Sequence, residues 1–279
     1  MLNKGELKAL LKKHDVRPNK RLGQNFLVDK NMQRKLLKNC NLAVDDVVLE
    51  IGPGLGALTF DIAKHVKQVF AVEKDKRLSG PLKDSAAGYD NINIITGDIL
   101  KFDMEKIYKD KKIKVIGNLP YYITSPIVSY LIERRNCIDS VFLTVQKEVG
   151  YRLAAGPGTK DYSPISIFTQ FYTEPRLLFI IAKGVFYPQP EVDSSFLRLD
   201  VAKRPRFKVK DEKFFFKIVR TAFSKRRKTI LNALTSGDVL GLKKQDVEKV
   251  LKTNCIDPMK RPEMLALKDF ASLSNHLTT

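Results

Sequence analysis

Four consecutive residues, Asn118 to Tyr121, carry groups that could hold a flat base bearing an amine. The side chain of Asn118 offers a carbonyl oxygen as a hydrogen-bond acceptor, and the ring of Tyr121 offers a face for stacking. Pro120 favours an extended backbone at Leu119, which would aim the Leu119 carbonyl in one direction. Two acceptors and a stacking face suit the exocyclic amine of adenine or cytosine. The alternative is an ordinary turn between a strand and a helix.

Two acidic residues lie at the ends of predicted strands. Glu73 follows the strand predicted over residues 66–72, and Asp98 follows the strand over residues 92–96. An acid after the second strand of an α/β fold commonly binds ribose hydroxyls. Asp98 could accept from an adenine amine while the backbone N–H of Ile99 donates to the ring. Each acid alone could be a solvated strand end, but together they favour an adenosine site at the C-terminal edge of a parallel sheet.

A glycine-rich turn, G-P-G-L-G from Gly52 to Gly56, separates an apolar strand over residues 47–51 from a helix over residues 57–65. This order is typical of the start of an α/β nucleotide-binding fold. The turn alone does not distinguish NAD, FAD and S-adenosylmethionine (SAM). No phosphate-binding lysine follows it, and SAM has no phosphate. The pattern therefore predicts methyl transfer from SAM to a nucleobase amine, with catalysis by alignment of donor and acceptor.

The net charge of +19 is concentrated in two segments. Residues 1–39 carry eleven Lys and Arg against three Asp and Glu, and residues 201–230 carry twelve against two. Two basic patches indicate a polyanionic partner, and RNA is favoured because its unpaired loop bases are readily splayed. A splayed base could stack between Tyr121 and Phe186, although Phe186 could equally be an ordinary packing residue. The predicted RNA-binding residues are Lys20, Arg21, Arg220, Lys225, Arg226, Arg227 and Lys228.

Cysteine and histidine usage argues against a metal site. The three cysteines lie far apart, and they make no ligand spacing with the three histidines. A disulfide framework is therefore not expected, and a reducing compartment is favoured. No apolar run approaches the roughly 20 residues that cross a membrane, and the N-terminus resembles neither a secretory signal nor an Arg-rich presequence. We expect a cytoplasmic monomer that binds no metal and no membrane.

The predicted elements indicate two domains. Residues 1–200 are predicted as a methyltransferase domain with a basic N-terminal arm over residues 1–30. Its fold class would be α/β, a Rossmann-like sheet of SAM-dependent methyltransferases with helices on both faces. Residues 201–279 are predicted as a basic linker and a small all-α domain that binds RNA or the ribosome. Residues 166–172 are predicted as a strand of the sheet, and residues 225–234 as a helix of the second domain.

Several motifs together give the chain a resemblance to a known family. They are R-L-G-Q-N-F-L, E-I-G-P-G-L-G-A-L-T, G-N-L-P-Y, Q-K-E-V with R-L-A-A-G-P-G-T-K-D-Y, F-Y-P-Q-P-E-V-D-S and A-F-S-K-R-R-K-T-I, and they extend from about Arg21 to Leu234. In these motifs the chain resembles the small-subunit (16S) ribosomal RNA adenine dimethyltransferases of the KsgA type. The resemblance is weaker to the large-subunit rRNA methylases of macrolide resistance, which tend to differ at Gly23 and Leu119 and have a shorter tail.

The resemblance implies a reaction and its residues. It implies dimethylation of two adjacent adenines in the 3′-terminal hairpin loop of small-subunit rRNA, within a 30S-type pre-ribosomal particle. It implies SAM contacts at Asn25, Leu27, Gly52, Glu73, Asp98 and Asn118. It implies target-base contacts at Asn118, Leu119, Pro120, Tyr121 and Phe186. The chain departs from the family pattern at Tyr122, and at Glu191, where the family often has Lys, so one positive charge beside the target pocket is absent.

Two other classes of function are open. A non-catalytic RNA-binding factor of ribosome assembly or transcription could use the same fold, but the intact segment from Asn118 to Tyr121 argues against a purely binding role. A nicotinamide-dependent dehydrogenase would bind NAD and not SAM. Transfer of a labelled methyl group to undermethylated small ribosomal subunits distinguishes the enzyme from the binding factor.

Overall fold

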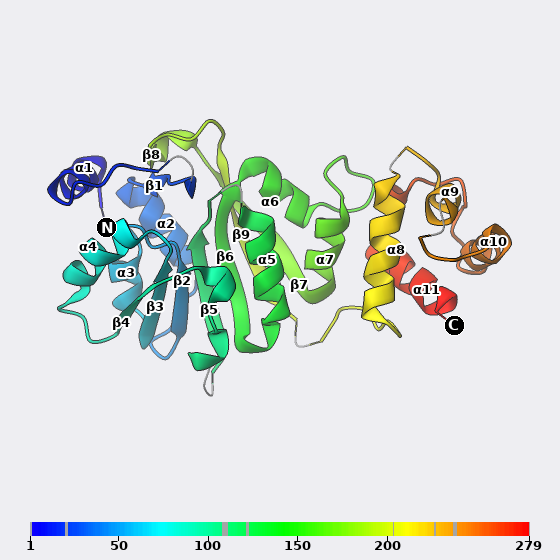
Figure 1. The fold of residues 1–279 in the computed structure, drawn as a ribbon, viewed down its shortest axis with the longest axis horizontal. Coiled ribbons are helices and arrows are strands. Elements are labelled where there is room, and N and C mark those ends of the chain that lie inside the picture. The colour runs from blue at the N-terminus through cyan, green and yellow to red at the C-terminus, as the bar shows by residue number, and fades with distance from the viewer. Residues whose placement is uncertain are drawn as a thin grey trace. The chain divides into compact units, whose positions relative to one another are not determined.

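A computed structural model of the chain describes residues 2–19, 22–107, 111–120, 123–202, 204–225, 227–236 and 239–278. The chain forms two compact units (Figure 1). Unit 1 comprises residues 1–150 and 176–201, and unit 2 comprises residues 151–175 and 202–279. Unit 1 ends one residue after the predicted boundary at residue 200, whereas residues 151–175, which were predicted in the first domain, group with unit 2.

Unit 1 is built on a seven-stranded sheet with the order β4-β3-β2-β5-β6-β9-β7 (Figure 1). Strand β2 pairs in parallel with both β3 and β5, β5 pairs in parallel with β6, and β9 pairs antiparallel with β6. The chain order reverses between β2 and β5, and such a switch point creates a crevice at the carboxyl ends of the strands. The strands are β2 (Val47–Ile51), β3 (Gln68–Glu73), β4 (Ile92–Thr96), β5 (Ile113–Asn118), β6 (Ile138–Gln146), β7 (Thr173–Ile181) and β9 (Ser194–Val201).

Helices and short connections complete unit 1. The α-helices are α1 (Lys4–Lys13), α2 (Lys30–Asn39), α3 (Thr59–Ala63), α4 (Lys76–Ala86), α5 (Thr124–Glu133) and α6 (Lys147–Ala154), which ends in unit 2. The 3-10 turns are η2 (Ile99–Lys101), η3 (Met104–Lys106), η5 (Arg135–Cys137) and η6 (Lys183–Val185). Helix α1 packs on the unit through the buried side chains of Leu7 and Leu11, which join a cluster with Leu55 and Leu78.

A two-stranded sheet holds the segment after α1 in place. Strand β1 (Phe26–Leu27) pairs antiparallel with β8 (Phe186–Tyr187). The buried Gln33 side chain donates to the Leu27 carbonyl, and Asp29 caps α2 by accepting from the Met32 N–H. The polar residues that precede β1 are thus attached to a well-anchored strand.

Unit 2 is helical, and one of its helices was predicted as a strand. The helices are α7 (Pro164–Tyr172), α8 (Glu212–Ser224), α9 (Ile230–Thr235), α10 (Lys244–Thr253) and α11 (Leu267–Leu277), with the 3-10 turn η7 (Pro262–Met264). The strand prediction for residues 166–172 is wrong, because a short apolar run fits either element and here Pro164 occupies the first turn of a helix. The ring of Phe171 stacks on that of Phe215 in α8, with 4.8 Å between the ring centroids. This packing explains why residues 151–175 belong to unit 2.

The helix predicted over residues 225–234 is also shorter than expected. Helix α8 ends at Ser224, and α9 begins at Ile230 after Thr229, whose side chain caps it. The basic residues Lys225, Arg227 and Lys228 therefore lie in the connection between α8 and α9. By contrast, the strands over residues 47–51 and 92–96 are confirmed with the predicted bounds. Within the described residues, no helix is both long and apolar enough to cross a membrane.

Candidate functional site

One pocket of unit 1 opens at the carboxyl ends of the parallel strands, on both sides of the switch point between β2 and β5. Predicted donor and acceptor residues that lie far apart in the sequence come together in it. They are Asn25, Leu27, Gly52, Glu73, Asp98, Ile99, Asn118, Leu119 and Pro120.

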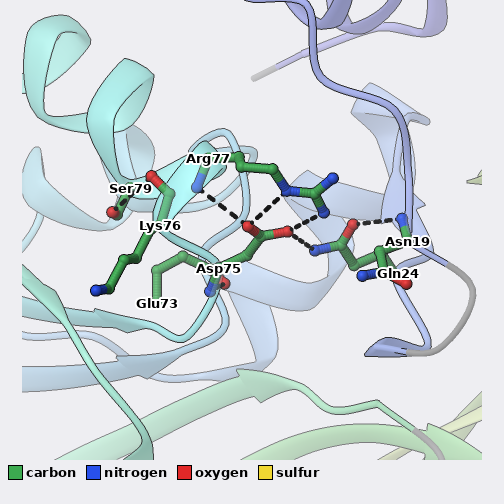
Figure 2. Close-up of polar contacts among 7 residues, drawn as sticks. All are labelled: Asn19, Gln24, Glu73, Asp75, Lys76, Arg77 and Ser79. Carbon is green, nitrogen blue, oxygen red and sulfur yellow. Dashed lines mark hydrogen bonds and ion pairs between the residues drawn. The ribbon is translucent and has the colours of Figure 1, made fainter.

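Glu73 ends β3 and is 6 % exposed. One carboxylate oxygen accepts from the Gly54 N–H at 3.0 Å, and the other accepts from the Asp75 N–H at 2.8 Å (Figure 2 shows the turn around Asp75). Burial raises the pKa of the Glu73 carboxyl, while the two N–H groups oppose the rise. A carboxylate oxygen has two lone pairs, so both oxygens could also accept from two adjacent ribose hydroxyls.

Asp98 follows β4 and caps η2, with one oxygen accepting from the Leu100 N–H at 3.0 Å. Its other oxygen pairs with the Lys74 ammonium at 2.8 Å. Burial acts to raise the pKa of Asp98, but the ammonium and the N–H outweigh it and hold the pKa below its ordinary value. The ionised carboxylate is an acceptor for an adenine amine, and Lys74 would have to share it.

Asn118 is the last residue of β5, and its side-chain amide is oriented by the chain segment before β1. Its N–H donates to the Asn25 carbonyl at 2.9 Å, which leaves the side-chain oxygen available as an acceptor. The backbone around Leu119 is also held. The Leu119 N–H donates to the Thr144 carbonyl at 3.0 Å, and the Pro120 carbonyl accepts from Ile123. These two hydrogen bonds, one before and one after the Leu119 carbonyl, fix its direction.

The glycine turn after β2 is shaped by close contacts. Gly54 has a φ of +61°, which favours glycine, and a side chain there would approach the Phe26 ring to 2.9 Å. The same residue donates its N–H to Glu73. The turn therefore connects β1 with the end of β3, and a larger residue would disturb both contacts.

Glu50, the last but one residue of the apolar strand β2, is a pocket residue that was missed from the sequence. It is 4 % exposed, and among the described residues its Oε2 has no hydrogen-bond partner. Burial raises the pKa of Glu50 to about 7, and the neighbouring Glu73 adds to the rise. An acid inside an otherwise apolar buried strand was the signal available, because such a group requires a partner.

The residues predicted to stack on the target base are placed differently. Phe186 is 4 % exposed, belongs to the hydrophobic core and lies opposite Leu27 in the β1–β8 pair, so it does not line the pocket. Its stacking role stays a prediction that requires the ring to move. Tyr121 and Tyr122 lie outside the described residues. Glu191 is exposed, and its carbonyl accepts from Lys183.

Four of the predicted RNA-binding residues are exposed on unit 2, namely Arg220, Lys225, Arg227 and Lys228. A second set of exposed cations precedes these four in the sequence. Between Arg204 and Lys210, every second residue is an exposed Lys or Arg, and the residues between them are partly buried. Lys20, Arg21 and Arg226 lie outside the residues whose side chains are described. The described cations of the second basic segment are thus exposed and belong to one unit, and their role in RNA binding stays a prediction.

The described residues hold no group of three or more His, Cys, Asp or Glu side chains that could bind a metal ion. The described cysteines are free, with Cys40 and Cys137 buried and Cys255 exposed.

Comparison with protein families and curated proteins gives a consistent result. The model of the family described as ribosomal RNA adenine dimethylase matches residues 16–278. The chain is 44 % identical over 282 residues to ribosomal RNA small subunit methyltransferase A of Moorella thermoacetica, covering 98 % of this chain and 97 % of the relative. It is 42 % identical over 274 residues to the protein of the same name from Alkaliphilus oremlandii, covering 97 % and 95 %.

Comparison with solved structures supports the fold. A dimethyladenosine transferase from Plasmodium falciparum superposes with a TM-score of 0.75 at 24 % identity, over 89 % of this chain and 95 % of that one. The 23S rRNA methyltransferase ErmE superposes with a TM-score of 0.73 at 24 % identity, over 91 % of this chain and all of the other. At this identity the likeness concerns the fold, a Rossmann-like sheet with an added helical part.

Proposed function

The chain belongs to the ribosomal RNA adenine dimethylase family, and from this premise we propose that its pocket binds SAM and transfers methyl groups to the exocyclic amines of rRNA adenines. The observation that carries the proposal is the convergence of Glu73, Asp98 and Asn118, from the ends of three strands, on one pocket. Two carboxylates suit an adenosine moiety, and the amide suits an amine that becomes a nucleophile.

The donor side of the pocket fits the polar groups of SAM. Glu73 would accept from the ribose hydroxyls, and Asp98 from the adenine amine next to the Ile99 N–H. The Oε2 of Glu50, which has no partner among the described residues, would accept from the donor's ammonium group. This contact would also stabilise the ionised form of the buried acid. SAM supplies an activated methyl group on a sulfonium, and no metal is needed for its transfer.

The acceptor side would activate the target amine by hydrogen bonding. The Asn118 side-chain oxygen and the Leu119 carbonyl would both accept from the amine, drawing its lone pair out of conjugation with the ring and towards the methyl group. These two acceptors are held by the Asn25 and Thr144 carbonyls, so little reorganisation is needed. The methylated amine is acidic and can release its proton without a strong base.

The finer features of the proposal come from the sequence motifs. We propose that the targets are two adjacent adenines in the 3′-terminal hairpin loop of small-subunit rRNA, presented in a pre-ribosomal 30S-type particle. The exposed cations of unit 2 would bind phosphates and hold the particle. The protein would act as a cytoplasmic monomer without a metal ion.

The decisive experiment is transfer of tritiated methyl groups from SAM to small ribosomal subunits purified from cells that lack the enzyme. Primer extension then maps the modified bases, and two adjacent dimethyladenosines in the 3′-terminal hairpin are expected. Binding of the subunits without methyl transfer would support the non-catalytic factor and contradict the proposal. Methylation of a different RNA would retain the chemistry and contradict the assigned substrate.

A further inference from the structure

The segment over residues 22–26, here called the arm segment, is attached to the pocket at several points. The Gln24 side chain accepts from the Asn19 N–H at 2.8 Å and donates to the Asp75 carboxylate at 2.9 Å (Figure 2). The next carbonyl, of Asn25, accepts from Asn118. The Phe26 ring lies against Gly54. The arm segment thus contacts both the donor side and the acceptor side of the pocket.

Asp75 is the residue that joins the arm segment to the donor side. It is 6 % exposed, and its backbone N–H donates to one oxygen of Glu73. Its side chain is held by Arg77, whose backbone N–H and guanidinium donate three hydrogen bonds, and the carboxylate then accepts the fourth from Gln24 (Figure 2). The Arg77 guanidinium, ahead of Gln24, keeps the pKa of Asp75 below its ordinary value. The ionised acid is therefore a strong and directional acceptor for Gln24.

The acceptor side depends on the same segment. Asn118 has an amide that could turn by half a rotation, which would present an N–H to the target amine in place of the oxygen. The Asn25 carbonyl prevents this by accepting from the amide N–H at 2.9 Å. The position of the Asn25 backbone is in turn set by its neighbour Gln24, which is held on Asp75.

We propose that Asp75 is a positioning residue that couples the two halves of the reaction, acting through the Glu73 carboxylate on the donor side and through Gln24 and the arm segment on Asn118. This inference rests on the proposed function of the pocket. The bond between Gln24 and Asp75 ties the turn whose N–H donates to Glu73 to the arm segment that orients the Asn118 amide. When the bond is lost, both donor affinity and the rate of transfer fall.

The chemistry of the bond suggests a swap experiment. Gln24→Glu removes the donated hydrogen bond and places two carboxylates against each other, so we expect donor affinity to fall at least about tenfold. Asp75→Asn supplies an N–H to the carboxylate introduced at position 24 and still caps α4, because Asn is as good an N-cap as Asp. The double variant Gln24→Glu/Asp75→Asn is therefore expected to bind the donor better than the Gln24→Glu variant, by about threefold or more.

The measurements are made on the full chain. Titration calorimetry with S-adenosylhomocysteine gives donor affinity without any RNA, and methyl transfer to small subunits gives kcat and KM. Thermal melts detect loss of folding, and Gln24→Ala, which introduces no repulsion, replaces Gln24→Glu if the latter does not fold. Asp103→Asn, at an exposed cap of η3, is the matched control and should not change binding or transfer.

The outcomes separate this inference from the proposed function. Rescue of affinity and kcat in the double variant supports the coupling. Unchanged affinity in Gln24→Glu, or a double variant no better than it, overturns the coupling even if the wild type methylates rRNA. A wild type that binds the donor but methylates nothing overturns the proposed function, and the swap then still decides the donor half of the coupling by affinity. A wild type that binds no donor overturns both.

Discussion

The donor pocket of unit 1 and the basic surface of unit 2 place charge in opposite ways. The pocket holds Glu50, Glu73 and Asp98, of which the two glutamates are buried, and the pKa of each of the three is shifted. The surface holds Arg220 and the cations after it, which are exposed. A charge in a buried site acts on specific neighbouring atoms, whereas an exposed cation acts through a screened field that many residues share.

This contrast predicts where single substitutions should have large effects. In the pocket, the acidic and amide groups act on particular atoms at hydrogen-bond distance, so one substitution changes the chemistry of the site. On the surface, one cation contributes one phosphate contact among several, and its loss is graded and dependent on salt. We therefore expect the effect of a substitution to decrease from the reacting amide, through the buried acid, to the exposed cations.

Asn118→Ala should have the largest effect. It removes the acceptor oxygen at the reacting amine, and loss of one such preorganised group typically slows catalysis by on the order of 10²–10³-fold. The fold should persist, because Asn118 is partly exposed at the end of its strand. Single-turnover methyl transfer measures the effect, and Asn93→Ala, at an exposed position of β4, is the control. A normal rate of transfer by Asn118→Ala would show that the Asn118 side chain is not needed for the reaction. It would also contradict the expectation that single pocket substitutions have the largest effects.

Glu50→Gln should weaken donor binding by about 10- to 100-fold, because a hydrogen bond between charged groups is lost. It should also stabilise the protein without donor. The folded pKa of about 7 lies above the ordinary value of 4.5, so wild-type stability is lost as the pH rises between these values, by on the order of 3 kcal/mol. The Glu50→Gln variant does not lose this stability, so the difference in free energy of unfolding between the variant and the wild type should grow between pH 5 and pH 8.

Urea unfolding across this pH range measures the stability, and calorimetry measures the affinity. Glu105→Gln, which changes an exposed glutamate, is the control for both. A pH-independent difference between the Glu50→Gln variant and the wild type would mean that Glu50 is not a buried neutral acid at low pH. Unchanged affinity would mean that the donor does not use it.

Replacing Lys225, Arg227 and Lys228 together by Gln should have the smallest effect on methyl transfer for each residue changed. Affinity for undermethylated small subunits should fall, and the slope of log affinity against log salt should flatten by about 0.7–0.9 per lost phosphate contact. Donor affinity should not change. The control removes three exposed lysines elsewhere in unit 2, Lys243, Lys244 and Lys249. An unchanged slope, or an equal change in the control, would show that this surface makes no specific contribution.

Much of the site could be predicted because it lies at strand ends. Apolar strands followed by Gly52, Glu73, Asp98 and Asn118 are visible as a pattern, and parallel strands necessarily present these ends at one edge. The motif containing Asn25 and Leu27 acquired its role only from the family resemblance. Their place beside Asn118 depends on the docking of β1 on β8, which involves residues about 160 positions apart.

The errors arose where a short segment has no decisive local signal. Residues 166–172 are apolar enough for a strand or a helix, and packing of aromatic rings between α7 and α8 decided the outcome. The same packing moved residues 151–175 into unit 2. The core covers the ring of Phe186 in the fold, and the role of that ring in stacking on a target base stays a prediction.

The class of fold, the family and the edge of the sheet where the chemistry lies could be read from the chain alone, because hydrophobic periodicity and residues at strand ends are local properties. Which polar atoms meet depends instead on how remote segments pack. The tertiary structure left one Glu50 oxygen without a hydrogen-bond partner among the described residues, attached Gln24 to Asp75, and turned the Asn118 amide with the Asn25 carbonyl. Hydrogen bonds form or fail over a few tenths of an ångström, and such distances between remote segments are set by packing alone.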